Sequence, residues 1–127
     1  MNTSVQVLVV SRDPILLETR QLILKRHFRV KGAANVQDAE RLVLRNDFEL
    51  IILCYTLNES ECARLLGLVQ SLNPIPRTLA LSAGGTSCVP EGVEQLWIAD
   101  GGPGRLVARS AELLGIDLNA KIRTACA

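Results

Sequence analysis

Strand-length apolar runs alternate with helix-length amphipathic segments along most of the chain, and this alternation limits its fold more than any other feature. Val5–Val10, Leu50–Leu53 and Arg77–Ser82 have the length and mostly apolar character of buried strands. Between them, apolar residues recur every three or four positions, which is typical of a helix that covers a core. Strands and helices that alternate through short connections predict a parallel sheet with right-handed crossovers and helices on both faces.

Capping residues and prolines mark the expected ends of three helices. Asp13, which precedes a proline, and Asn35 are predicted N-caps because their side chains can accept hydrogen bonds from the first free backbone N–H groups. A third helix is expected to begin at Asn58 or Ser60 and to end before Pro74.

The remaining segments predict the edges of the sheet. Residues 28–34 alternate between apolar and charged side chains, so we expect an edge strand there. Residues 83–92 contain three glycines and a proline, so a fourth helix is expected to be shortened or lost. A short fifth strand at 95–98 and a last helix from Pro103 to a stop at Gly115 complete the expected order of elements.

The size and composition of the chain suit one domain. Its 127 residues are expected to form a domain at 1–115 and a C-terminal tail at 116–127. Apolar residues make up 48% of the chain and aromatic residues 3%, so the core is expected to be aliphatic. The net charge of +1 gives no large overall attraction to nucleic acid or to an anionic membrane. No apolar run approaches the roughly 18 residues of a membrane helix, and we expect a cytoplasmic protein.

The cysteines and the single histidine do not form a metal-binding pattern. Cys54, Cys62, Cys88 and Cys126 lack the paired short spacings of zinc sites, and His27 is the only histidine. The glycine-rich segments match neither a Walker nor a dinucleotide-binding fingerprint. We therefore expect no metal and no cofactor.

Three motifs together resemble one known family. They are VLVVSRDP at the first strand, FRVKGAANVQDAERLVLRNDFELIILC from the second strand to the third, and ALSA at the end of the fourth. With them, the stretch from Val5 to about Leu114 resembles the receiver domain of bacterial two-component response regulators. The resemblance implies an α/β fold of flavodoxin-like type, a doubly wound sheet of five parallel strands in the order 2-1-3-4-5.

The resemblance also identifies the positions of the family's phosphorylation site, and the acidic residues of that site are missing. The aspartate that accepts the phosphoryl group is replaced by Cys54. The two acidic residues that help to hold magnesium are replaced by Ser11 and Arg12. The resemblance therefore implies a degenerate site rather than a working one.

Three further positions complete this comparison with the family. The lysine expected after the fifth strand is replaced by Ala99 or Asp100, depending on a register ambiguity of one residue. The switch hydroxyl is kept as Ser82, and Trp97 stands near the position of the switch aromatic residue.

The chemistry of phosphorylation makes the substitutions decisive. The reaction needs a carboxylate nucleophile and a hard divalent cation that neutralises the developing charge. A soft sulfur, a neutral hydroxyl and a guanidinium cannot replace that set of oxygen ligands. We expect no magnesium-dependent phosphorylation and no enzyme activity.

Two interpretations of Cys54 are open in the sequence. It is either a small apolar plug in a pocket that no longer holds a metal ion, or a redox thiol whose pKa is lowered by Arg12 and by nearby helix N-termini. Arg12 either fills the place of the lost cation, paired with Asp13, Asp100 or a backbone carbonyl, or is a solvated arginine in a loop.

The sequence favours a stand-alone signalling domain of two-component type that acts by phosphorylation-independent protein–protein interaction. Its expected partner is a protein, either a signalling kinase or a regulator, and a homodimer is compatible with the same interpretation. A thiol-based redox sensor centred on Cys54 is the first alternative. A small-ligand-binding module of flavodoxin-like fold is the second.

Overall fold

A parallel sheet forms the centre of the molecule. The computed structural model describes residues 5–54, 56–73, 75–82, 94–97 and 102–115. The strands are β1 (Gln6–Val10), β2 (Arg29–Ala33), β3 (Leu50–Leu53), β4 (Arg77–Ser82) and β5 (Glu94–Trp97). They lie in the order β2-β1-β3-β4-β5, and every neighbouring pair is parallel. The order of the first four strands agrees with the prediction, and β5 adds to the free edge of β4.

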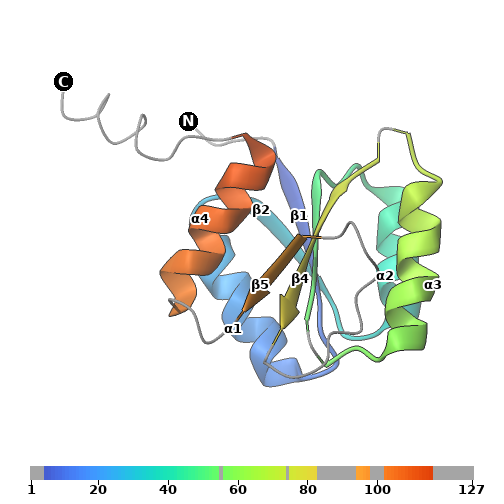
Figure 1. Ribbon diagram of the computed structural model, residues 1–127, viewed down its shortest axis with the longest axis horizontal. Helices are drawn as coiled ribbons and strands as arrows, with labels where there is room; N and C mark the ends of the chain where they lie inside the picture. The colour runs from blue at the N-terminus through green and yellow to red at the C-terminus, as the bar shows by residue number, and fades with distance from the viewer. Residues whose placement is uncertain (1–4, 55, 74, 83–93, 98–101, 116–127) are drawn as a thin grey trace.

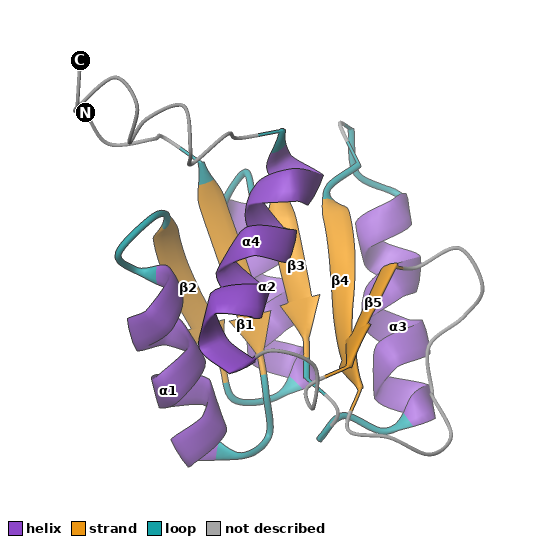
Figure 2. Ribbon diagram, turned by 60° about the vertical axis from the view of Figure 1, so that its left-hand side comes forward, coloured by secondary structure: helices purple, strands orange, loops and turns teal. Residues whose placement is uncertain are grey.

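Helices cover both faces of this sheet, as the alternation of segments predicts. They are α1 (Pro14–Leu24), α2 (Val36–Arg45), α3 (Glu59–Gln70) and α4 (Gly102–Leu114). Figure 1 shows α1 and α4 on one side of the sheet and α2 and α3 on the other, and Figure 2 shows the strands between these layers. No helix in the described part of the chain is long and apolar enough to cross a membrane. Residues 83–92, where we expect a shortened helix, lie outside the described residues.

The core consists of two apolar layers that share the strands. Along β3, Leu50 and Ile52 pack with the residues of α1 and α4, whereas Ile51 and Leu53 pack with those of α2 and α3. Successive side chains of a strand point to opposite faces, so a strand covered on both sides must be apolar throughout. The alternation continues into the next residue, since Cys54 belongs to the layer of α1 and α4.

The predicted caps and the predicted edge strand are confirmed. Asp13 Oδ1 accepts hydrogen bonds from the N–H groups of Ile15 at 2.9 Å and Leu16 at 3.2 Å. Of the two expected starts for the third helix, Asn58 is the N-cap, and it forms a reciprocal capping box with Glu61. Such caps contribute about 1 kcal/mol each. β2 lies at the edge of the sheet.

Two glycines in helical surroundings should respond to alanine in opposite directions. A methyl group at either Gly67, exposed within α3, or Gly115, which follows α4, would meet no other atom within 4 Å. Gly67→Ala should raise the free energy of unfolding by about 1 kcal/mol because alanine favours the helix. Gly115 has a φ of +71°, so Gly115→Ala should lower the free energy of unfolding by about 1 kcal/mol. Urea denaturation measures both, and effects of the same sign would contradict this assignment.

Candidate functional site

The ends of β1 and β3 bring two of the predicted site residues together at the carboxyl edge of the sheet. Cys54 donates its backbone N–H to the carbonyl of Val10 at 3.0 Å, so the two strand ends lie side by side. Ser11 is fully buried and Cys54 is 2% exposed. Chemistry in an open parallel sheet is expected at this edge. The predicted acceptor position and one predicted metal position therefore lie together in one buried site, called the pocket below.

An arginine of α1 enters this pocket. Arg20 is 7% exposed, and its Nη1 donates a hydrogen bond to the sulfur of Cys54 at 3.1 Å. Arg20 follows Leu17 by three residues and precedes Leu24 by four, so these side chains share one face of α1. That face packs against the sheet, and Leu24 is fully buried there. A guanidinium therefore lies against the thiol at the predicted acceptor position.

Hydroxyl groups close the other side of the pocket. The Ser11 and Thr56 hydroxyl oxygens are 3.2 Å apart and share a hydrogen bond. Thr56 also accepts the backbone N–H of Arg12 at 3.0 Å, and Ser11 accepts that of Asp13 at 3.2 Å. These contacts fix the loop after β1 to the loop after β3. Residue 55 between them lies outside the described residues.

Of the two open interpretations of Arg12, the structure supports the solvated surface arginine and not the replacement of a cation. Its side chain is 56% exposed and its Nη1 lies 3.5 Å from Oε1 of Glu61 at the start of α3. Asp13 does not pair with it, because the Asp13 carboxylate caps α1. Exposed pairs of this kind contribute little, at most about 1 kcal/mol. Arg12 is therefore a surface arginine, and Arg20 is the cation of the site.

Burial controls the acidity of the thiol. Desolvation raises the pKa of Cys54 above the ordinary thiol value of 9.0, and this outweighs the lowering by the charge of Arg20 and by hydrogen bonds from Ser11 and Arg20. The redox interpretation, in which Arg12 and nearby helix N-termini lower the pKa of Cys54, is not supported by this direction. Cys54 is the buried thiol that the first interpretation expected, and it is protonated at neutral pH.

The residues of this pocket do not fit a magnesium ion. Magnesium takes oxygen ligands in an octahedral array, and carboxylates are its usual protein ligands. The pocket offers two hydroxyls, a protonated thiol and a guanidinium, whose positive charge would repel the ion. No group of three or more His, Cys, Asp or Glu side chains that could hold a metal is present among the described residues.

The remaining predicted positions are only partly described. Ser82 at the end of β4 pairs with Trp97 at the end of β5 in the parallel sheet, and their side chains are not among the described parts of the structure. Ala99 and Asp100, the two alternatives for the lysine position, lie outside the described residues, as does Cys88.

Sequence reasoning missed Arg20, although a signal for it was present. Arg20 lies in the polar run ETRQ, which separates the apolar triplets ILL and LIL of α1. Leu17, Arg20 and Leu24 are nevertheless spaced by three and four, so the arginine interrupts an otherwise apolar helix face. A charged residue in the core-facing stripe of a helix requires a buried partner, and Cys54 provides one.

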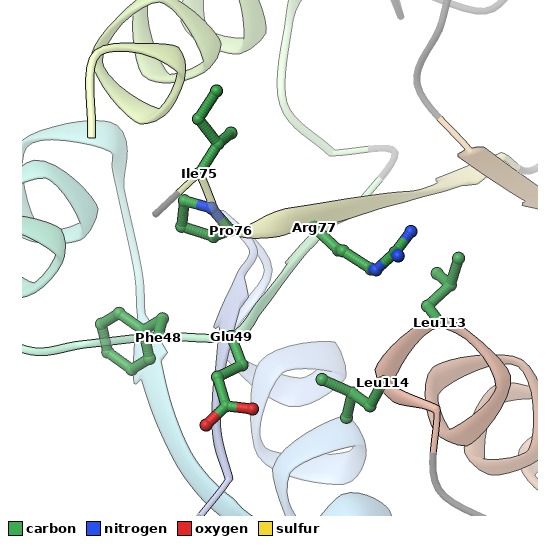
Figure 3. Close-up of a pocket in the computed structure, with 7 residues that line it drawn as sticks. All are labelled: Phe48, Glu49, Ile75, Pro76, Arg77, Leu113 and Leu114. Atoms are coloured by element: carbon green, nitrogen blue, oxygen red, sulfur yellow. The ribbon is translucent and has the colours of Figure 1, made fainter. Parts of the chain in front are cut away.

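A hollow at the opposite edge of the sheet was also missed. Its volume is about 220 Å³ and it lies between α4 and the starts of β3 and β4 (Figure 3). Its lining consists of Phe48, Glu49, Ile75, Pro76, Arg77, Leu113 and Leu114. In Figure 3 the side chain of Arg77 extends toward α4. None of the predicted site residues lines this hollow.

No protein-family model matches the chain, and no curated protein matches its sequence. Solved structures match it over most of its length. The signal receiver domain of an HD domain-containing protein from Pseudomonas fluorescens Pf-5 has a TM-score of 0.75 at 16% identity, over 89% of this chain and 96% of that chain. The chemotaxis protein CheY4 of Vibrio cholerae has a TM-score of 0.69 at 17% identity, over 87% and 99%. The BeF3-activated DrrB receiver domain has a TM-score of 0.66 at 18% identity, over 89% and 99%. The chain therefore has the fold of response-regulator receiver domains.

The raised pKa of Cys54 makes folding stability fall at high pH. The folded-state pKa lies above the unfolded value, so the stabilisation is fully present below that value and is lost as pH rises through the folded pKa. Cys54→Ala removes this dependence. Above pH 9.0 the free energy of unfolding should fall more steeply in the unmodified protein, by up to about 1.4 kcal/mol per pH unit. Urea unfolding at several pH values measures it, and parallel curves for the two proteins would contradict it.

Arg20, not Arg12, should control the titration of Cys54. Arg20→Met keeps the length of the buried stem but removes the charge that lowers the thiol pKa, so the pKa should rise further. Arg12→Met is the matched control and should leave the pKa unchanged, because Arg12 pairs with Glu61. The ¹³Cβ chemical shift of Cys54 followed against pH measures the pKa in both variants. Equal shifts in the two variants would refute the assignment.

Proposed function

We propose that the chain is a degenerate receiver domain that takes part in two-component signalling through protein–protein interaction, without phosphorylation and without enzyme activity. Its partner is a protein, either a signalling kinase or a regulator. The fold supports the signalling part of this proposal, because response-regulator receiver domains share it at TM-scores of 0.66 to 0.75. The composition of the pocket at the carboxyl edge supports the rest.

The hydrogen bond from Arg20 to Cys54 is the observation that carries the proposal. This hydrogen bond is 3.1 Å long and buried. It lies at the position where the resemblance to receiver domains implies a carboxylate and a bound cation. A thiol in this position is not the carboxylate nucleophile that forms an acyl phosphate. The guanidinium supplies a permanent positive charge inside the site, so a divalent cation gains nothing by entering.

The same geometry supports a site that stays in one state. A receiver that is switched by phosphorylation needs a charge that arrives and leaves. Here the charge belongs to α1, and Ser11 and Thr56 tie the adjacent loops together by a hydrogen bond of 3.2 Å. The domain then presents a constant surface to its partner, and regulation acts on its amount or location rather than on this pocket.

The redox alternative has weaker support. Redox-sensing thiols are usually exposed and have a low pKa. Cys54 is 2% exposed and its pKa is raised by burial. Cys62, also buried, belongs to the apolar layer on the other face of the sheet, so it is not placed to resolve an oxidised Cys54.

Incubation of the full chain with acetyl phosphate and magnesium should leave its mass unchanged. The nucleophile and the metal ligands are absent from the pocket, so no acyl phosphate can form. Cys54→Asp alone should also remain unmodified, because the new carboxylate pairs with Arg20 and no acidic residue stands at positions 11 and 12. Intact mass spectrometry followed by peptide mapping is the measurement. One added phosphoryl group on the unmodified protein, mapped to the Cys54 loop, would refute the proposal.

A combined reversion, made both with Arg20 retained and with Arg20→Met, is the positive control for this experiment. Interacting site residues act as a unit, so single changes are not expected to add up to activity. The changes that should be needed together are Cys54→Asp, Ser11→Asp, Arg12→Asp and a lysine in place of Ala99 or Asp100. Arg20→Met in the same background then tests whether the buried guanidinium alone blocks the restored site.

A further inference from the structure

A cluster of basic side chains covers the end of α1 and the edge strand. Lys25, Arg26, His27, Arg29 and Lys31, here called the basic cluster, fall within seven residues that contain no Asp or Glu. All five are exposed. The whole chain has a net charge of only +1, so this positive charge is local and is balanced elsewhere.

The lysines and arginines of the basic cluster differ from four other arginines of the described residues, although Arg45 and Arg105 are also exposed and have no such ion pair. Arg12, Arg41, Arg64 and Arg109 each have a carboxylate oxygen between 2.7 and 3.5 Å away. No such ion pair involves residues 25, 26, 29 or 31 within the described part of the chain. Among the described residues, the charges of Lys25, Arg26, Arg29 and Lys31 are therefore not neutralised by a neighbouring carboxylate.

An apolar hollow adjoins this charge. It lies between the end of α1 and the start of α4, its volume is about 350 Å³, and its lining residues are Leu22, Ile23, Arg26, His27, Gly104 and Val107. α1 and α4 lie together on one side of the sheet in Figure 1. Leu22 is 60% exposed although it is a leucine. Two residues of the basic cluster thus form part of the rim of an apolar hollow of the size that small ligands or single side chains occupy.

Local structure explains only part of this arrangement. Positive residues near the C-terminal end of a helix interact favourably with its dipole, which applies to Lys25 and Arg26. Arg29 and Lys31 lie on the edge strand, where charge discourages pairing with other chains. Neither effect explains the exposed leucine beside the hollow.

The chemistry of the surface distinguishes between possible anionic partners. Single-stranded nucleic acid is usually held by basic residues together with exposed aromatic rings on which bases stack. Phe28 and Phe48 are 5% and 6% exposed, so neither offers such a ring. A bilayer would cover a broad surface rather than insert one side chain into a hollow. A protein segment that combines carboxylates with an apolar side chain matches both features.

We propose that the basic cluster and the adjoining hollow bind an acidic amphipathic segment of a partner protein. One leucine or phenylalanine of that segment enters the hollow beside Leu22, and its flanking Asp or Glu residues pair with Arg26 and with the lysines and arginine around it. This inference rests on the proposed function, since it gives the protein–protein interaction a position and a partner chemistry. It does not involve the pocket of Cys54, which lies at the carboxyl ends of β1 and β3.

Fluorescence anisotropy with the full chain tests this binding. The probe is a fluorescein-labelled peptide of about 15 residues, long enough for several helical turns, with Leu and Phe at helical spacing among Glu and Asp. This peptide should bind, and two substitutions should each weaken its binding about tenfold or more. Arg26→Glu reverses the charge that pairs with carboxylates of the peptide, and Leu22→Asp makes the hollow unfavourable for an apolar side chain. Arg45→Glu is the matched control: Arg45 is an exposed arginine on α2, on the opposite face of the sheet, and should change binding by less than about twofold.

Comparison probes give the outcomes that overturn the inference. A poly-glutamate peptide of equal length that binds as tightly would reduce the site to unspecific charge attraction. Tighter binding of a single-stranded oligonucleotide or of phosphatidylserine vesicles would assign the surface to another class of partner. Equal weakening by Arg45→Glu, or no binding of the amphipathic peptide, would also refute it. If the peptide tests fail and acetyl phosphate leaves the protein unmodified, only this inference is refuted. If a phosphoryl adduct forms at Cys54, the proposed function is refuted whether or not the peptide binds.

Discussion

Burial of β3 on both faces is the constraint on which the rest of the structure depends. Its residues Leu50–Leu53 are at most 1% exposed, so helices must lie on both sides of the sheet. Right-handed crossovers then place α1 and α4 together on one face and α2 and α3 on the other. The alternation of side chains along β3 continues to Cys54 and directs it toward α1. The thiol therefore faces the residue of α1 that packs against this end of β3.

The residue that α1 presents is a cation, and this determines the character of the pocket. A guanidinium buried without a partner would cost several kcal/mol, so Arg20 and Cys54 have to be considered as a pair. Burial keeps the thiol protonated, while Arg20 opposes that effect without overcoming it. In our proposal the arginine takes the place of the metal ion that the resemblance to receiver domains implies. Unlike a metal ion, a side chain of a helix cannot dissociate.

Similarity of fold and similarity of site chemistry depend on different physical constraints. The three receiver domains compared above are 16 to 18% identical to this chain, which is enough to keep the pattern of buried strands and amphipathic helices. That pattern tolerates many exchanges among aliphatic residues. Phosphorylation chemistry tolerates few, because a carboxylate and hard oxygen ligands have no substitutes. The structural match therefore shows the fold alone, and function has to be argued from the residues at the strand ends and on the surface.

The sequence by itself determined the succession of strands and helices along the chain, the caps at Asp13 and Asn35, and the position of Cys54 at the end of a buried strand. These features depend on residues that are close to one another in the chain. The spacing of apolar residues and the identity of capping residues therefore reveal them directly. Only the tertiary structure decided that Arg20 rather than Arg12 contacts the thiol, and that burial outweighs charge in its pKa. Arg20 and Cys54 are 34 residues apart in the chain. Which side chains meet across such a separation depends on how the helix packs on the sheet, and the balance between desolvation and charge depends on the distances which that packing sets.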